Sequence, residues 1–357
     1  MSYERLARAI MRERGLIFPE GYDGSLTLRE VEEGIKYVKD HFEDALALAL
    51  NLTRVTAPIF VTRESGINDH LSGAEQPVRF MLRAMNQDAE IVQSLAKWKR
   101  LALALYEFQQ GEGLYTDMNA IRPDERPDNL HSVYVDQWDW ERVISAEERT
   151  LGFLKDIVRR IYRVIYETEQ NVCARFANLE APYLPSDITF VHSKDLEALY
   201  PHLSPREREN AICREAGAVF IIGIGAPLRD GRPHDDRAAD YDDWWTETSP
   251  GKRGLNGDIL VWYPLLDCAM ELSSMGIRVD KTSLMQQLEA KGEMDKLSLY
   301  FHRQLMQDAL PLTIGGGIGQ SRLCMLFLRR AHVGEVQASV WPEEMLALCR
   351  AHGIRIL

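Results

Sequence analysis

The stretch from Thr313 to Arg322 constrains this chain most, because it places four glycines within five positions. An apolar run, Leu310 to Ile314, leads into these glycines, and a helical pattern follows from Leu323 to Arg329. Glycine at a strand-to-helix junction lets the backbone approach a ligand closely, since no Cβ stands in the way. Arg322 is then expected on the first helical turn, where its planar guanidinium could stack on a base or bind a phosphate.

The glycine stretch fits neither of two common phosphate-binding motifs. No Lys-Ser or Lys-Thr follows its last glycine, which excludes a Walker loop, and Gln320 stands where a dinucleotide fingerprint needs glycine. A glycine-rich turn beside a surface arginine remains open as the alternative from these residues alone.

Composition excludes several classes of protein. The 357 residues are 45% hydrophobic and 27% charged, which is typical of a globular protein with a large core. A net charge of −12 argues against a nucleic-acid partner. No apolar run approaches the ~20 residues that cross a bilayer, so we expect no membrane partner. Five cysteines without a CxxC pair indicate reduced thiols and a cytoplasmic location.

The order of predicted elements favours one α+β domain on a mostly antiparallel sheet. Capping boxes predict three helix starts, at Thr27–Glu30, Ser145–Glu148 and Ser204–Glu207, and Gly217 is placed to end the third helix. Further helices are predicted at 97–108, 281–292 and 295–308. Strands are predicted at 55–61, 78–82, 90–93, 133–135, 218–224, 259–263, 270–279 and 335–341. The segment from Pro227 to Gly257 is predicted to be a long functional or mobile loop.

Nine segments together carry a resemblance to a known family. Beside the glycine stretch they are Asn68–Glu75, Ser94–Arg100, Gly111–Tyr115, Arg122–Glu125, His131–Glu141, Asp240–Trp244, Leu255–Trp262 and Glu271–Arg278. The glycine stretch resembles the third motif of class II aminoacyl-tRNA synthetases, and the full set resembles the ammonia-dependent asparagine synthetases (aspartate–ammonia ligases). The resemblance runs from about residue 27 to residue 342.

The resemblance implies a class II synthetase-like catalytic domain over 25–357, an antiparallel sheet flanked by helices, preceded by an extension over 1–24. It implies ATP-dependent ligation of ammonia to L-aspartate through a β-aspartyl-adenylate, giving asparagine, AMP and pyrophosphate, with Mg²⁺. It also implies a homodimer in which the helix after Thr27 and the strand around Pro58 form the contact. An amphipathic helix packed only on its own core is the alternative, and Tyr3–Arg14 could form a further helix.

The nucleotide side of the site is assigned through the resemblance. Arg122 matches the second-motif arginine that holds the α-phosphate, and Arg322 matches the arginine that stacks on adenine. Asp258 and Glu271 match the metal carboxylates, since Mg²⁺ takes one or two carboxylates beside phosphate oxygens. Asp242, Ser274 and Gly317 also match nucleotide-side positions. From the residues alone, the arginines could be surface charges, and the two carboxylates could cap strands or pair with Arg278.

The aspartate side must bind two carboxylates and one ammonium. Lys99 and Arg278 match positions that hold the carboxylates. Gln137 and Asp139 lie two apart, which places both on one face of a strand, with Asp139 suited to the ammonium. Asp69 and Ser94 match positions near the reacting carboxyl, with Asp69 the candidate proton acceptor or a turn cap beside Gly73. The expected catalytic residues are Asp69, Lys99, Arg122 and Gln137.

Two departures from the family pattern are the extension and Gln93, which stands where bacterial members carry histidine before Ser94. Two other functions compete. An aspartyl- or asparaginyl-tRNA synthetase shares adenylate chemistry but needs a tRNA-binding domain, for which the sequence before residue 27 leaves no room. A non-enzymatic synthetase paralogue is expected to lose the charged site residues, which this chain keeps.

Overall fold

An eight-stranded sheet forms the centre of the part of the chain that the computed structural model describes, residues 15–68 and 76–357. The predicted helix at Tyr3–Arg14 lies outside those residues. The strand order across the sheet is β1 (Leu52–Arg54), β5 (Gly113–Ile121), β6 (Tyr134–Val143), β13 (Thr313–Gly319), β12 (Cys268–Ile277), β11 (Asn256–Tyr263), β8 (Ala218–Ile222) and β7 (Thr189–His192). Only the outer pairs of this sheet, β1 with β5 and β7 with β8, are parallel. The prediction of an α+β fold on a mostly antiparallel sheet is confirmed.

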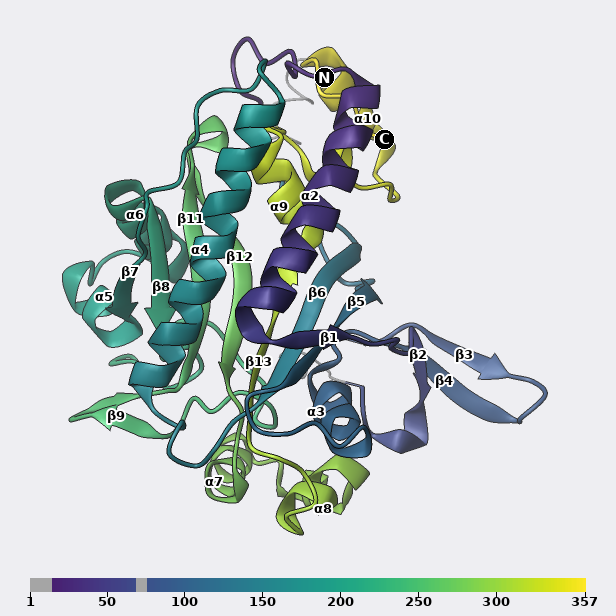
Figure 1. Cartoon of the computed structure of the whole chain (residues 1–357), viewed down its shortest axis with the longest axis vertical. Helices are drawn as coiled ribbons and strands as arrows, with labels where there is room; N and C mark the ends of the chain where they lie inside the picture. The colour runs from purple at the N-terminus through teal and green to yellow at the C-terminus, as the bar shows by residue number, and fades with distance from the viewer. Residues whose placement is uncertain (1–14, 69–75) are drawn as a thin grey trace.

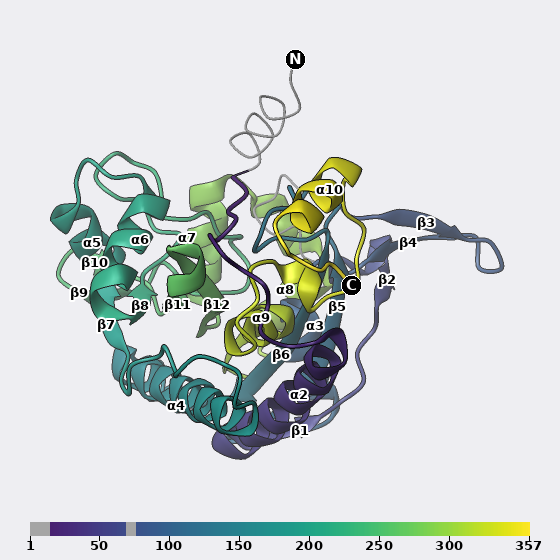
Figure 2. The same cartoon turned by 90° about the horizontal axis from the view of Figure 1, so that it is seen from above.

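One face of the sheet is covered by α2 (Leu28–Leu50), α4 (Leu151–Arg175) and α9 (Gln320–Phe327), as Figures 1 and 2 show. The capping box at Thr27 is present, and one face of α2 is buried through Val31, Val38 and Phe42. Phe42 packs against Trp138 of β6 with ring centroids 4.7 Å apart. Residues of β6 that alternate with Trp138 must therefore point to the opposite face.

The opposite face carries α3 (Ala96–Leu105) on one side and α5 (Ser193–Leu199) and α6 (Pro205–Ala216) on the other. Lys99 of α3 contacts the odd-numbered side chains of β6, while Ile212 of α6 packs with Leu260 of β11. The capping box at Ser204 and the end of α6 at Gly217, whose φ is 75°, agree with the prediction. Between these helices the middle of the sheet stays uncovered by regular structure, and there the site lies.

The remaining elements flank the sheet. They are a three-stranded arm of β2 (Phe60–Thr62), β4 (Gln87–Ile91) and β3 (Arg79–Leu82), a small pair of β9 (Glu247–Ser249) and β10 (Lys252–Arg253), and the helices α7 (Lys281–Lys291), α8 (Tyr300–Met306) and α10 (Glu343–Ala351). Figure 1 shows β3 and β4 projecting from the body as an arm. Residues 15–24 lie against the core, where the Ile17 amide donates to Asn129 Oδ1 at 2.8 Å.

Four predictions of local structure are wrong. The glycines belong to strand β13 rather than to a loop after it. Of the strand predicted at 55–61 only residues 60 and 61 lie in a strand, β2, while residues 55–59, with Pro58 among them, form an irregular link from β1 to β2. The predicted final strand at 335–341 is irregular and is followed by α10, since its apolar residues pack under the C-terminal segment without a strand partner. The fourth case is the helix expected at Ser145, which begins only at Leu151 with Thr150 as its N-cap.

Candidate active site

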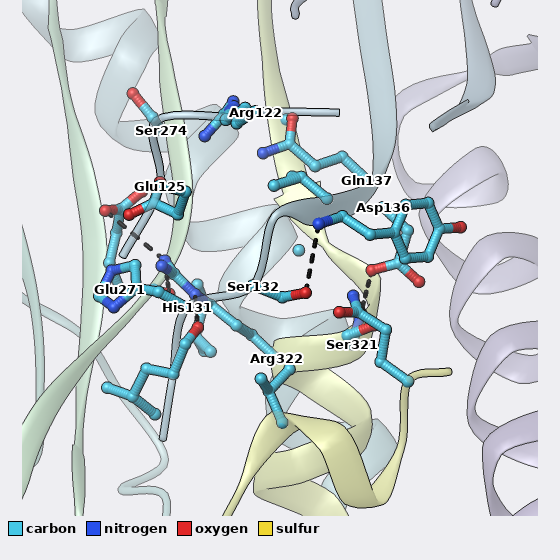
Figure 3. A pocket seen from close by; sticks show the side chains of 18 of the residues that line it. Arg122, Glu125, His131, Ser132, Asp136, Gln137, Glu271, Ser274, Ser321 and Arg322 are labelled. Carbon is cyan, nitrogen blue, oxygen red and sulfur yellow. Dashed lines mark hydrogen bonds and ion pairs between the residues drawn. The ribbon is translucent and has the colours of Figure 1, made fainter. Parts of the chain in front are cut away.

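A cavity of about 480 Å³ opens on the uncovered part of the sheet (Figure 3). Six residues predicted from the sequence line it, namely Arg122, Gln137, Glu271, Ser274, Gly317 and Arg322. They come from β6, β12, β13, α9 and the segment after β5, and Figure 3 shows the labelled side chains facing one another across the cavity. Segments far apart in the sequence therefore meet at one polar site.

Gly317 and Gly319 of β13 form the floor of this site, and atoms of the neighbouring strands come too close for a side chain at Gly316 and Gly317. A Cβ on Gly317 would lie 2.2 Å from Oε1 of Gln137, and one on Gly316 would lie 2.6 Å from the backbone oxygen of Ser274. Neither glycine has a positive φ. Close approach of other protein atoms is thus the reason for glycine at these two positions, and the alternative of a glycine-rich turn does not apply to them.

Arg122 reaches the cavity with uncommitted donors. One of its terminal nitrogens donates to the backbone oxygen of Gln93 at 3.4 Å, while its buried Nε has no hydrogen-bond partner among the residues that the structure describes. Burial lowers the pKa of the guanidinium, and the charge of Glu125 opposes that change. A buried donor left unpaired costs free energy, so an incoming anion would gain a strong hydrogen bond.

Arg322 lies at the other end of the cavity, on the first turn of α9 as predicted. Its guanidinium donates to the backbone oxygen of Glu271 at 2.9 Å and to that of Leu130 at 3.4 Å. The Glu271 carboxylate lies 3.7 Å away and is 41% exposed. These bonds run in the guanidinium plane, which leaves its faces available for stacking.

Asp258 and Glu271 lie on the paired strands β11 and β12, close enough for the charge of Glu271 to raise the pKa of Asp258. Burial is the main cause of that raised pKa, and Arg237 opposes it. One nitrogen of Arg237 donates to both Asp258 oxygens, at 2.7 and 3.0 Å. Within residues 15–68 and 76–357, no group of three or more metal-binding side chains occurs. Two oxygen donors beside an open cavity, with a cationic side chain seated against one of them, fit Mg²⁺ that completes its shell with phosphate and water.

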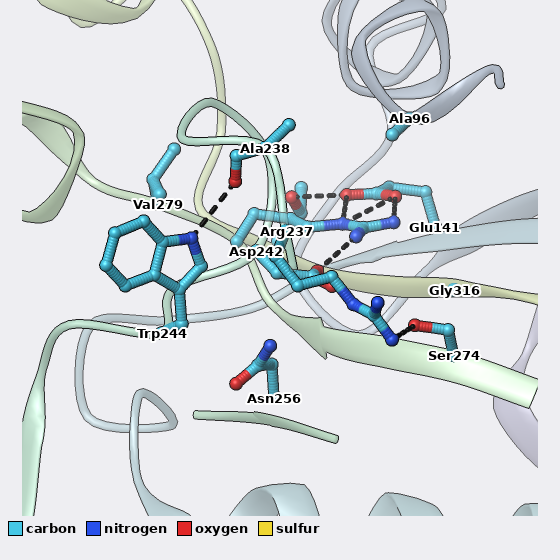
Figure 4. A network of polar contacts seen from close by, with 12 residues as sticks. Ala96, Glu141, Arg237, Ala238, Asp242, Trp244, Asn256, Ser274, Val279 and Gly316 are labelled. Carbon is cyan, nitrogen blue, oxygen red and sulfur yellow. Dashed lines mark hydrogen bonds and ion pairs between the residues drawn. The ribbon is translucent and has the colours of Figure 1, made fainter. Parts of the chain in front are cut away.

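A buried network of ion pairs adjoins the cavity (Figure 4). Its members are Lys99, Asp139, Glu141, Asp242 and Arg278, each at most 4% exposed. Lys99 pairs with Asp139 and lies 3.7 Å from Glu141. Arg278 holds Glu141 through two nitrogens, at 2.8 and 3.0 Å, and also pairs with Asp242. The predicted carboxylate-binding cations are therefore brought together, but each is already paired with a protein carboxylate.

One further predicted residue, Ser94, does not line the cavity, and a second cannot be placed. Asp69 lies outside the residues that the structure describes, so its predicted role stays a prediction. Ser94 Oγ accepts the amide hydrogen of Ala96 at 3.2 Å, at the start of α3. Beside it, Gln93 is fully buried, and within residues 15–68 and 76–357 neither its amide oxygen nor its amide nitrogen has a hydrogen-bond partner.

Sequence reasoning missed Arg237 and Glu141 as members of the site. Both lie inside segments that the sequence did mark: Arg237 in the loop 227–257, and Glu141 at the end of the His131–Glu141 segment. What no sequence pattern could show was their ionic partners, because Arg237 and Asp258 are 21 positions apart and Glu141 and Arg278 are 137 apart.

The loop 227–257 is firmly held rather than loose. The side chain of Gln287 donates to the backbone oxygens of Ala239 and Asp242, at 2.8 and 3.0 Å, and accepts from the amide of Trp244. Trp244 is 2% exposed and packs with α7 and α8. The loop therefore presents Arg237 to the cavity from a fixed base.

Comparison with known proteins finds similar sequences in one enzyme family. A family model described as aspartate-ammonia ligase matches residues 29–353. An aspartate–ammonia ligase of Clostridium perfringens is 57% identical over 343 residues, covering 96% of this chain and 99% of that protein. Aspartate–ammonia ligases of Parabacteroides distasonis and Bacteroides fragilis are 56% and 53% identical over the same shares.

Solved structures share the fold at much lower identity. Asparaginyl-tRNA synthetase from Pyrococcus horikoshii, complexed with asparaginyl-adenylate, superposes with a TM-score of 0.66 at 13% identity, covering 88% of this chain and 70% of that one. The Entamoeba histolytica asparaginyl-tRNA synthetase with asparaginyl-adenylate gives 0.60 at 16% identity, covering 87% and 66%. At such identity the likeness concerns the fold, which is that of class II synthetases.

Proposed function

The chain belongs to the aspartate–ammonia ligase family, and from that membership we propose that it makes L-asparagine from L-aspartate, ammonia and ATP in the cavity described above. One observation supports this site above others: Arg122, Arg322 and Glu271, from three separate segments, line a single cavity together with Gly317 and Gly319. Asp258 lies next to this lining, on the strand paired with that of Glu271. A carboxylate must be activated before ammonia can displace its oxygen, and this set of groups suits activation by ATP.

The reaction proceeds through a β-aspartyl-adenylate. A β-carboxylate oxygen of aspartate attacks the α-phosphorus of ATP, and the bond to the β-phosphate breaks to release pyrophosphate. The lone pair of ammonia then attacks the acyl carbon, the C–O bond to AMP breaks, and a base takes a proton from nitrogen. Asp69 stays our candidate for that base.

Each cavity residue has a role in this sequence. Arg122, with its unpartnered Nε, stabilises the charge that develops on the α-phosphate. Arg322 stacks on adenine while the backbone oxygens of Leu130 and Glu271 fix its plane. Gln137 lies against Gly317 on the cavity floor and orients the aspartyl group. Asp258 and Glu271 would hold Mg²⁺, which supplies charge neutralisation for the phosphates when bound.

Aspartate binds where the buried network meets the cavity. Gln137 and Asp139 lie on one face of β6, so the strand connects the open cavity to the pair formed by Asp139 and Lys99. Lys99 and Arg278 offer positive charge to the substrate carboxylates, and Asp139 offers negative charge to its ammonium. Binding therefore requires an exchange of partners within the network rather than capture by free charges.

A homodimer is part of the proposal. The helix α2 packs on its own core through one face, as the alternative expected, yet Leu48 on another side is 87% exposed. Next to it, β1 forms one edge of the sheet, followed by exposed Ile59 and Phe60. Sedimentation velocity tests this assembly, and a monomer at micromolar concentration would refute it.

A cytoplasmic location is proposed as well, since all five cysteines are unpaired. None of the helices within the described residues has the length and apolar character that crossing a membrane requires.

Product analysis tests the reaction. The protein is incubated with ATP, Mg²⁺, aspartate and ammonium chloride, with and without tRNA. Equal amounts of asparagine and AMP without tRNA are expected. Formation of ADP in place of AMP would refute the adenylate route, and AMP followed by aspartyl-tRNA only when tRNA is added would place the activity with the synthetases.

A further inference from the structure

Arg237 stands at the boundary between the cavity and the metal carboxylates. Its side chain is 11% exposed, and its guanidinium contacts the side chains of Asp258, Asp235 and Ser274 and the backbone oxygen of Asp236. The bond to Ser274 Oγ is 3.4 Å long. Figure 4 shows the Arg237 side chain directed toward Ser274 and apart from Glu141.

The ion pair between Arg237 and Asp258 uses a single nitrogen. That nitrogen donates to both Asp258 oxygens, while the other terminal nitrogen pairs with Asp235, which is 55% exposed. The nearby pair of Arg278 and Glu141 uses two nitrogens and lies fully inside the protein. A two-nitrogen contact fixes both position and angle, whereas a one-nitrogen contact holds a carboxylate less firmly.

The charges around Asp258 call for a cation. Asp258 is 6% exposed, and Glu271 adds a second negative charge on the adjoining strand. A buried, ionised carboxylate is unfavourable without a compensating charge, so a cation beside Asp258 is needed to keep it ionised. In the structure that group is Arg237.

We propose, on the basis of the metal site proposed above, that Arg237 is a resident counter-ion that a divalent cation replaces at Asp258. Before the metal binds, Arg237 lines the cavity and neutralises Asp258, whose two oxygens it holds. When the metal binds, the guanidinium releases Asp258 and stays attached to Asp235 at the rim. Asp258 and Glu271 are therefore always accompanied by a cation, either Arg237 or the metal. Because Arg237 competes with the metal for Asp258, it lowers the affinity of the site for the metal.

The backbone around Arg237 permits this movement of one side chain. Its neighbour Asp236 pairs with Lys291 of α7, and the Ala238 oxygen accepts from Trp244 Nε1 at 3.0 Å. The residues on both sides are thus anchored to the protein. Exchange then requires rotation of the arginine side chain alone, while the loop keeps its place.

Metal binding without nucleotide tests the exchange apart from catalysis. Mn²⁺, whose free-ion electron paramagnetic resonance signal disappears on binding, is titrated into the full-length wild type and variants. Arg237→Gln removes the competing charge but keeps a polar side chain, and it should bind Mn²⁺ tighter by roughly tenfold or more. Arg237→Lys keeps the charge and should stay within roughly threefold of wild type. Arg232→Gln, exposed on the same loop and outside the cavity lining, is the matched control and should match wild type.

A second measurement keeps the proposal testable if Arg237→Gln is less stable than wild type. Its melting temperature is compared with that of wild type, each with and without 1 mM Mn²⁺. Because the variant leaves both carboxylates uncompensated, Mn²⁺ should raise its melting temperature more than that of wild type. Equal rises would overturn the exchange.

The remaining outcomes separate this inference from the metal site itself. Asp258→Asn should weaken Mn²⁺ binding strongly if the site is correct. Unchanged or weaker binding in Arg237→Gln, together with weak binding in Asp258→Asn, would overturn the exchange and leave the metal site standing. Binding as tight in Asp258→Asn as in wild type would overturn both.

Discussion

Replacing Gly317 by alanine should remove activity while leaving the protein folded. The added Cβ would lie 2.2 Å from Gln137 Oε1, whereas packed heavy atoms stay roughly 3.5 Å apart. The Gln137 amide must therefore move by about 1 Å. Because the atom it meets is the free end of a side chain, rotation relieves the overlap, at a cost of about 1 kcal/mol in an off-rotamer angle.

Gly316→Ala, one position away, should have the opposite outcome. Its Cβ would lie 2.5 Å from the Cβ of Met275 and 2.6 Å from the backbone oxygen of Ser274. Neither atom can rotate away, so β13 and β12 would have to separate. Overpacking of this kind costs about 1–3 kcal/mol, and a disturbed strand pair adds to that.

Two assays separate these effects. Pyrophosphate release reports the adenylation step, where displacement of a positioning group by about 1 Å costs on the order of 10²-fold in rate. Thermal unfolding reports stability, with Gly152→Ala as the control, since the nearest atom to its Cβ is 3.8 Å away. Full activity in Gly317→Ala would refute the role of Gln137. Equal losses of stability in the 316 and 317 variants would refute the assignment of the Gly317 contact to a movable side chain.

Three further predictions follow from single contacts. Arg122→Ala should lower pyrophosphate release by on the order of 10²-fold or more, since it removes a phosphate donor, yet keep the melting temperature, because its buried Nε has no partner to lose; a large drop in melting temperature would contradict this. Thr27→Ala should cost about 1 kcal/mol in urea unfolding, because Thr27 caps α2, whereas Ser145→Ala should cost less, because α4 begins at Leu151. Burial lowers the pKa of His332 to about 4, so the unfolded chain binds an extra proton between pH 6.5 and 4. Its contribution makes the free energy of unfolding fall by up to about 1.4 kcal/mol per pH unit as the pH drops through that window, and His332→Asn should remove that part of the slope.

Local signals predicted several elements well because their causes are local. The capping boxes at Thr27 and Ser204 start helices where the side chain and the amide that it caps lie three residues apart. At Ser145 the same capping pattern does not start a helix. Glu148 accepts the Ser145 amide hydrogen at 2.8 Å, but the chain continues irregularly until Thr150. A capping pattern therefore indicates a hydrogen bond, while the helix itself needs an apolar face to pack.

The glycine stretch shows the limit of such reasoning in the site. Its composition marked the right place, and Arg322 falls on the first turn of α9 as expected. The reason for the glycines was not visible, since it depends on β6 and β12 lying on either side of β13. No strand was predicted over Gly113–Ile121, where β5 lies, and a final strand was wrongly predicted at 335–341. Both errors have a similar cause, because pairing partners decide whether an extended segment becomes a strand.

Charge pairing is the part of the site that sequence reasoning could least supply. The resemblance assigned Lys99 and Arg278 to the substrate, yet the structure places each against protein carboxylates that lie 40 and 137 positions away. Leaving either cation unpaired in the interior would cost several kcal/mol, so the substrate-free protein must keep a carboxylate beside it. Aspartate carries two carboxylates and an ammonium, the same kinds of charge that the network already holds. Aspartate can therefore take the place of protein carboxylates beside Lys99 and Arg278 without leaving either cation unpaired. Asparagine has an amide in place of the second carboxylate, so it can replace only one of these protein carboxylates.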